Sequence, residues 1–237
     1  MRIAERLRAS AGLSRSSQSL RLVRRGNAEL RHRRLEAALI AFAGAVALDP
    51  HNAVAWNNQG LVLENLGREP EAMRAFNRAL ALRPKYVDAW VNKGIALLHY
   101  GNDGAAIECL DHALQLDPDN ALALVNRGVA LAAVGKIADA LDHFEGALRR
   151  DPTFALAWMN KAVALARQGR HGEAVRAFEE ALKVRPGWAD ALYRKALSLA
   201  ALGRIDAADE SLGRALTLRP AFPEARAALA ELRRGGT

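Results

Sequence analysis

Two short clusters in the sequence contain residue types that bind ions or phosphate groups. Cys109 and His112 stand three residues apart, which would place two metal ligands on one turn of a helix. The segment Gly128–Lys136 has a glycine followed later by a Gly-Lys pair, as a phosphate-binding loop does. However, six residues separate its glycines instead of four, and no serine or threonine follows the lysine. Neither cluster is therefore a complete site.

A third cluster, Asp117–Asn120, resembles the start of a calcium-binding loop but lacks its glycine and its final glutamate. The six histidines share no position in the pattern described below, and nothing resembles a nucleophile paired with a base. We therefore expect no enzymatic activity, no metal and no cofactor. We interpret these residues as parts of helices and turns.

Proline reveals the elements that position these residues, because six prolines recur at intervals of 34. They are Pro50, Pro84, Pro118, Pro152, Pro186 and Pro220. With each proline taken as position 32 of a repeat, other positions align. Positions 20 and 27 are alanine throughout: Ala38, Ala72, Ala106, Ala140, Ala174 and Ala208, then Ala45, Ala79, Ala113, Ala147, Ala181 and Ala215. A fixed period of this length predicts a repeat architecture.

The remaining aligned positions predict two helices in each repeat. Positions 4, 8 and 11 recur at helical spacing and form one buried stripe, and positions 20, 24, 27 and 28 form another. Small residues at positions 8, 20 and 27 allow two backbones to approach closely. Glycine at position 15 suits the left-handed end of the first helix, although Arg33 stands there in the first repeat. Proline at position 32 ends the second helix.

The period and these columns resemble the tetratricopeptide repeat family over residues 19–222. The resemblance implies an all-α fold, a right-handed superhelical solenoid of antiparallel helix pairs whose first helices line a concave surface. Stacking would bury the apolar face that a single pair leaves exposed. The six repeats are expected at 19–52, 53–86, 87–120, 121–154, 155–188 and 189–222. Residues 223–237 are expected to form a C-terminal capping helix and tail, with Pro223 in its first turn.

The positive charge of the chain is concentrated at its N-terminal end. Residues 1–34 contain ten arginines and two acids, and the rest is balanced, with 34 − 10 = 24 basic and 26 − 2 = 24 acidic residues. We interpret residues 1–18 as a basic arm, with a targeting peptide as the alternative. No apolar run is long enough to span a bilayer. The single cysteine suits a reducing compartment, so a cytoplasmic location is expected.

A second face of each first helix carries apolar and amide side chains where a purely structural helix would be polar. Positions 2, 6, 9 and 13 point away from the buried stripe, with position 5 at the edge. Position 6 gives four asparagines in register, and asparagine can pair with both N–H and C=O of a peptide. In similar repeats such asparagine ladders hold extended peptides. Because the asparagines lie off the buried stripe, we expect them to matter little for folding. The candidate peptide-binding residues are Asn58, Asn92, Asn126, Asn160, Arg194, Ile95, Val129, Val163, Met159, Leu122 and Leu156.

These observations predict a scaffold that binds a peptide or partner protein in its concave groove. One alternative is self-assembly into a homo-oligomer. Another is contact with nucleic acid or an anionic membrane through residues 1–34, where few aromatics are available for base stacking. Cations at position 7, such as Lys93 and Lys161, are interpreted as stems packed between helices. The carboxylate clamp of chaperone-binding relatives is not expected, because positions 5 and 9 are mostly apolar.

Overall fold

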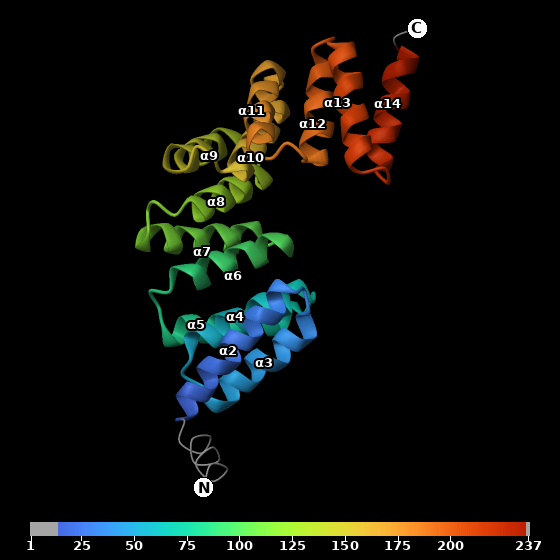
Figure 1. Cartoon of the computed structure of the whole chain (residues 1–237). Coiled ribbons are helices and arrows are strands. Elements are labelled where there is room, and N and C mark those ends of the chain that lie inside the picture. Colours follow the sequence, from blue (N-terminus) through green and yellow to red (C-terminus); the bar gives the residue numbers. More distant parts are fainter. Residues whose placement is uncertain (1–13, 236–237) are drawn as a thin grey trace. The chain divides into compact units, whose positions relative to one another are not determined.

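The computed structural model describes residues 14–235, and helices form consecutive antiparallel pairs along this part of the chain (Figure 1). The chain divides into two compact units, residues 1–118 and 119–237. Most of the expected basic arm, residues 1–13, lies outside the described residues, as do residues 236 and 237. The first helix begins at Arg15, so the last four residues of that arm are helical.

Each unit is a stack of helix pairs that keeps the period of the prolines. The first unit contains α2 (Arg15–Arg31), α3 (Leu35–Leu48), α4 (Ala53–Asn65), α5 (Glu69–Leu82), α6 (Val87–His99) and α7 (Asp103–Leu116). The second contains α8 (Ala121–Ala133), α9 (Ile137–Arg150), α10 (Ala155–Arg167), α11 (His171–Val184), α12 (Ala189–Ala201), α13 (Ile205–Leu218) and α14 (Pro223–Gly235). The described residues contain no strand, which confirms the expected all-α repeat solenoid.

The two helices of each pair pack with their backbones close together. A Cβ atom added to Gly60 would lie 2.8 Å from the ring of Phe76, and one added to Gly128 would lie 2.5 Å from that of Phe144. Carbon atoms do not pack at such distances. The alanines at positions 20 and 27 are all fully buried, as the sequence predicted. Position 8 therefore meets the side chain at position 24, and it is glycine or alanine in every repeat.

Successive pairs stack mainly through the second helix of one repeat and the first helix of the next, such as α3 with α4 and α11 with α12, and the first helices also touch one another. In the first unit α2 contacts α4 and α4 contacts α6, and in the second α8 contacts α10 and α10 contacts α12. No corresponding contact joins the second helices of successive repeats within the described part of either unit. First helices are thus nearer to one another than second helices are. They line the inner, concave side of each unit.

A tryptophan at position 4 ties a repeat to the one before it. The indole Nε1 atoms of Trp56, Trp90 and Trp158 donate to the carbonyl oxygens of the preceding prolines at 3.0, 2.9 and 2.9 Å. These carbonyls belong to Pro50, Pro84 and Pro152. In the terminal helix α14, the Nη2 atom of Arg226 donates to Pro220 O at 2.7 Å. The donor thus recurs at the cap, where α14 covers the last repeat with Ala225 fully buried.

The turn inside each repeat requires a left-handed residue. Gly67, Gly101, Gly135, Gly169 and Gly203 have φ between +70° and +84°. In the first repeat Arg33 adopts the same conformation, with φ 56°. The missing glycine therefore does not blur this helix end. The arginine instead adopts a conformation that costs a residue with a Cβ atom about 1 kcal/mol.

Replacing Ala147 by leucine should lower the free energy of unfolding by about 1–3 kcal/mol, because the site is fully buried and has no room for three more carbons. Ala138→Leu, at an exposed position of the same helix α9, is the matched control and should change stability by less than about 0.5 kcal/mol. Urea denaturation measures both. Equal midpoints for the two variants would contradict the close contact.

Replacing Arg33 by glycine should stabilise the protein by about 0.5–1 kcal/mol, since glycine enters the left-handed region without steric cost. The reciprocal change Gly135→Arg should destabilise by about 1 kcal/mol. A Cβ atom at residue 135 would meet nothing within 4 Å, so this change tests backbone conformation alone. Thermal and urea denaturation give both signs. A destabilised Arg33→Gly variant would show that the arginine side chain has a role of its own.

Candidate functional site

Fewer positions of the first helices are exposed than a helical wheel of an isolated helix predicts. Position 5 was expected at the edge of the groove, but Val91, Val125 and Met159 are at most 7% exposed. The expectation for Met159 is therefore wrong: it lies in the core and cannot receive a partner's side chain. The reason is that each first helix is covered by helices of neighbouring repeats as well as by its own partner.

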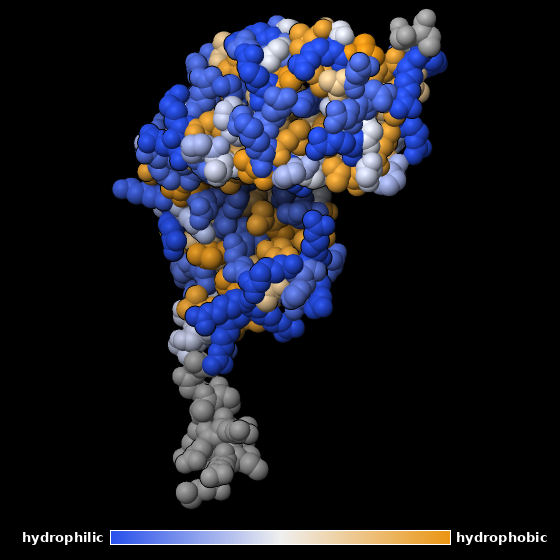
Figure 2. Space-filling view, turned by 45° about the horizontal axis from the view of Figure 1, so that its top comes forward, coloured by the Kyte–Doolittle hydropathy of each residue, from blue (hydrophilic) through white to orange (hydrophobic). Residues whose placement is uncertain are grey.

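The positions that remain accessible are 2, 6, 9 and 13. Ile95, Val129 and Val163 are half-buried, and Leu122 and Leu156 are 41% and 38% exposed. Apolar patches among charged side chains are visible on the face shown in Figure 2. The apolar component of the predicted surface therefore exists in both units, apart from Met159.

In the first unit, the asparagines are bonded to one another. Asn58 Nδ2 donates to Asn27 Oδ1 at 3.0 Å, Asn57 Nδ2 donates to Asn58 Oδ1 at 3.1 Å, and Asn92 Nδ2 donates to Asn57 Oδ1 at 3.1 Å. Asn57 at position 5 is only 3% exposed. This chain of amides links three successive repeats, so Asn58 and Asn92 contribute to packing. The expectation that these side chains matter little for folding is not met here.

In the second unit, the asparagines are freer. Asn126 Nδ2 donates to Leu122 O of its own helix at 2.8 Å. The Asn160 amide makes no hydrogen bond within residues 14–235 and lines an open pocket of about 210 Å³. This asparagine pocket is otherwise apolar except for one arginine. Its lining is Val129, Ala132, Ala133, Phe144, Asn160, Val163, Ala164 and Arg167.

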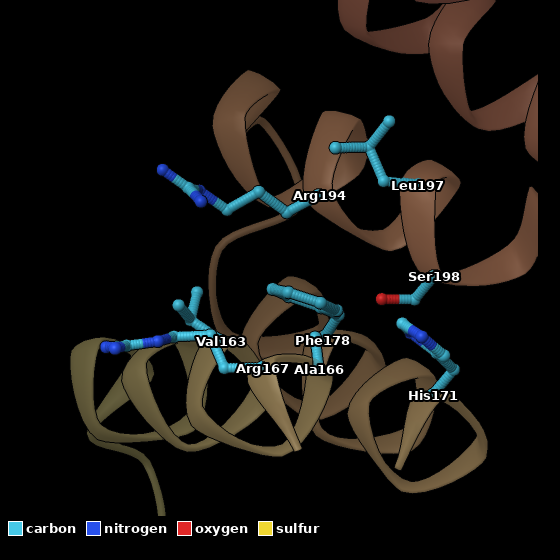
Figure 3. Close-up of a pocket in the computed structure, with 8 residues that line it drawn as sticks. All are labelled: Val163, Ala166, Arg167, His171, Phe178, Arg194, Leu197 and Ser198. Carbon is cyan, nitrogen blue, oxygen red and sulfur yellow. The ribbon is translucent and has the colours of Figure 1, made fainter. Parts of the chain in front are cut away.

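An arginine pocket of about 240 Å³ adjoins the asparagine pocket and shares Val163 and Arg167 with it (Figure 3). It lies between α10, α11 and α12. Its lining is Val163, Ala166, Arg167, His171, Phe178, Arg194, Leu197 and Ser198. The structure thus brings together four predicted residues, Val129, Asn160, Val163 and Arg194. It leaves Leu122, Asn126 and Leu156 outside both pockets and Asn58, Asn92 and Ile95 in the first unit.

Sequence reasoning missed Arg167, His171 and Ser198 as lining residues. A signal was present for Ser198, because position 10 is otherwise apolar in the later repeats, with Ala130 and Ala164 as examples. Arg167 is likewise the one arginine at position 13 of the second unit, and its Nη1 atom donates to Ala132 O at 2.9 Å. That hydrogen bond holds the guanidinium across the boundary between the two pockets.

Two cations at position 7, Lys161 and Lys195, pair with neighbouring acids, in line with the structural interpretation. Lys161 Nζ lies 2.9 Å from Glu145 and Lys195 Nζ lies 2.8 Å from Glu179. Lys161 also lies over the ring of Trp158, at 5.5 Å from its centroid. Each pair joins a first helix to the second helix of the preceding repeat. These lysines therefore stabilise the stack and do not form a free cationic row.

The cluster of Cys109 and His112 is occupied by packing. Cys109 is 5% exposed, and burial raises the pKa of its thiol. The His112 ring stacks on Trp90 at 4.7 Å between centroids. Within residues 14–235, no group of three His, Cys, Asp or Glu side chains is placed to hold a metal ion. In the same range, no helix is both long enough and apolar enough to cross a bilayer.

Comparison with known families identifies the fold. Models of the tetratricopeptide repeat match residues 23–87, 125–191 and 168–210, and a second such model matches residues 66–127. The chain belongs to the tetratricopeptide repeat family. Repeats of this family form scaffolds for protein–protein interaction. No curated protein matches the sequence.

Several solved structures share this architecture. One is the APC/C hetero-tetramer Cut9-Hcn1, with a TM-score of 0.84, 20% identity, and coverage of 91% of this chain and 43% of that one. Another is PilW, a type IV pilus biogenesis factor, with a TM-score of 0.82 and 23% identity; the match covers 89% of this chain and 98% of PilW. A third is YrrB, a tetratricopeptide protein described as having an unusual peptide-binding site, with a TM-score of 0.59 and 22% identity; the match covers 79% of this chain and 97% of YrrB. The chain thus spans less than half of the Cut9-Hcn1 chain. At these identities, the similarity establishes the fold alone.

Asn57→Ala and Asn160→Ala should differ in their effect on stability. Removal of the Asn57 amide breaks two hydrogen bonds in a buried chain and should cost about 1–3 kcal/mol. Asn160→Ala removes no internal bond and should stay within about 0.5 kcal/mol of wild type. Urea denaturation of both variants is the measurement. A destabilised Asn160→Ala variant would mean that this amide belongs to the packing after all.

Proposed function

We propose that the first helices of the second unit bind a segment of a partner polypeptide, and that this binding, without catalysis, is the role of the chain. The observation that carries the proposal is the pair of adjoining pockets between α8, α10 and α12. Both have apolar walls and a few polar groups, which is the usual composition of a recognition site. They follow one another along the concave side, as side-chain subsites for an extended or partly helical segment would.

Asn160 supplies the backbone contact in this proposal. Its amide has two donors and an acceptor and can pair with a peptide N–H and C=O together. Asn126 retains its carbonyl oxygen for the same purpose, because only its Nδ2 atom is used internally. Each such bond contributes roughly 0.5–1.5 kcal/mol net. Val129 and Val163 receive apolar side chains, and the exposed Leu122 and Leu156 extend the apolar surface along the first turns of α8 and α10.

The residues of the first unit have a secondary role. Asn58 and Asn92 already donate to neighbouring amides, so fewer of their groups are available to a partner. Ile95 is half-buried and offers apolar surface only. Similarity to a tetratricopeptide protein that is described as having a peptide-binding site supports the proposal at the level of the fold.

Val163→Gln tests the proposal because Val163 lines both pockets. Peptides selected from a random displayed library on the wild-type protein are labelled, and their dissociation constants are measured by fluorescence polarisation. Val163→Gln should weaken them by about tenfold, since an apolar contact is replaced by an amide that has no partner. The loss should persist at high salt, because the contact is apolar.

The matched control is Val184→Gln, at the 45% exposed end of α11 and outside both pockets. It should leave the dissociation constants unchanged. Circular dichroism and urea denaturation should show that both variants remain folded. Undiminished binding by Val163→Gln, or equal losses in the two variants, would place the functional surface elsewhere. Selection of peptides that displace a second copy of the chain would favour self-assembly.

A further inference from the structure

We propose that the arginine pocket selects a tyrosine side chain that stands next to an acidic residue in the bound segment. The inference rests on the proposed function, which places a polypeptide in this groove, and adds the chemistry of the segment. The phenol ring lies between the apolar walls, its hydroxyl meets Ser198 beside the His171 ring, and the neighbouring carboxylate meets Arg194 and Arg167.

The two pockets are lined by corresponding positions of successive repeats. Seven residues of the arginine pocket stand 34 positions after seven of the asparagine pocket, from Val129 and Val163 to Ala164 and Ser198. Three of these positions change their chemistry: Ala133 becomes Arg167, Asn160 becomes Arg194 and Ala164 becomes Ser198. Every one of these changes adds hydrogen-bond donors, and two add a positive charge. The arginine pocket is thereby equipped for a more polar and more acidic ligand than its neighbour.

The polar groups at one end of the arginine pocket have no internal partner. Ser198 is only 2% exposed, and its hydroxyl points into the pocket beside the His171 ring (Figure 3). It makes no hydrogen bond within the described residues. The Nδ1 atom of His171 is buried and also has none. The Ser198 hydroxyl lines the pocket and can both donate and accept a hydrogen bond, so it favours a ligand that brings a hydroxyl to this end.

Two guanidinium groups flank the opposite side. In Figure 3 the side chains of Arg194 and Arg167 extend to the same side of the pocket, from α12 and α10. The Arg194 guanidinium forms no ion pair in the part of the chain that the structure describes, and Arg167 bonds only a backbone carbonyl. Acids of the neighbouring helices are already paired: Glu173 with Arg170, Glu179 with Lys195 and Asp190 with Arg219. The positive charge at this mouth is therefore left for an anion from outside.

The side chains between these two ends are apolar, and they limit which ligand side chain can fill the pocket. Val163, Ala166, Phe178 and Leu197 form an apolar section, where a carboxylate would lose its hydration without compensation. An aromatic ring suits this section, and an apolar cavity of about 150 Å³ already accommodates benzene. Tyrosine alone among the residues joins such a body to a hydroxyl at its tip. The charge must stay at the mouth, on an adjacent residue or on a free carboxylate.

Small probes test this chemistry before any partner is identified. N-acetyl-tyrosine carries the ring, the hydroxyl and a carboxylate, N-acetyl-phenylalanine lacks the hydroxyl, and N-acetyl-tyrosine amide lacks the carboxylate. Titrations of the isotope-labelled full chain followed by NMR should show saturable shifts at Val163, Leu197 and Ser198 with N-acetyl-tyrosine. Each of the other two probes should bind about three- to tenfold more weakly, as expected for one lost hydrogen-bonding group.

Two variants test which side chain contacts the hydroxyl of the probe and which contacts its carboxylate. Ser198→Ala should abolish the preference for N-acetyl-tyrosine over N-acetyl-phenylalanine but keep the preference for the carboxylate. Arg194→Gln should do the reverse. Arg214→Gln, an exposed arginine of α13 with no ion pair in the described residues, is the charge-matched control and should change neither. Absence of saturable shifts at the pocket, or equal binding of all three probes, would overturn the inference.

The displayed library separates this inference from the proposed function. Peptides selected on the wild type should be enriched in tyrosine next to aspartate or glutamate, and the enrichment should disappear when selection is repeated on the Ser198→Ala, Arg194→Gln double variant. Peptides that bind, depend on Val163 and show no tyrosine preference would leave the groove as the binding site and refute the tyrosine pocket. Failure of Val163→Gln to weaken any peptide would remove the groove itself.

Discussion

The structure depends on one steric constraint, the contact between position 8 of each first helix and the large side chain at position 24 of its partner. Gly60 against Phe76 and Gly128 against Phe144 leave no space for a Cβ atom. Such proximity lets the two helices of a pair pack closely, and alanine takes position 8 in the last two repeats, at Ala162 and Ala196. Because the pattern recurs, the same positions are buried in each repeat. The alanine columns, the tryptophan contacts with proline carbonyls and the lysine–glutamate pairs recur on this pattern.

A regular frame also separates the residues that build the fold from those that can vary. Positions 3, 5, 8 and 11 are largely buried by contacts with the partner helix and with neighbouring repeats, whereas positions 2, 6, 9 and 13 remain at the concave side. Two pockets lie between successive first helices of the second unit, and their chemistry is set by a few side chains. The asparagine and arginine pockets illustrate this: their walls are alike, and three substitutions distinguish them.

Much of this fold could be predicted from the sequence because its determinants are local and repeated. Proline at position 32, alanine at positions 20 and 27 and glycine at position 15 each mark a helix end or a close contact that backbone geometry alone requires. Less of the candidate binding site could be predicted in this way. A helical wheel treats a helix in isolation, so it could not show that Met159 is covered by a neighbouring repeat. Nor could it show that Asn58 and Asn92 belong to a chain of amides, or that Arg167 and Ser198 meet in one pocket from different repeats. These properties arise only when repeats are stacked.

The tryptophans at position 4 have a spectroscopic consequence. Trp56 and Trp90 each report on one inter-repeat contact of the first unit, and Trp158 reports on one in the second, because each indole bonds the carbonyl of the preceding repeat's proline. Separation of two repeats would expose that indole to water and shift its fluorescence emission to the red. A chain stabilised mainly by neighbour contacts can unravel from its ends, with different repeats opening at different denaturant concentrations. Single-tryptophan variants would thus act as intrinsic fluorophores that record the order in which the repeats separate.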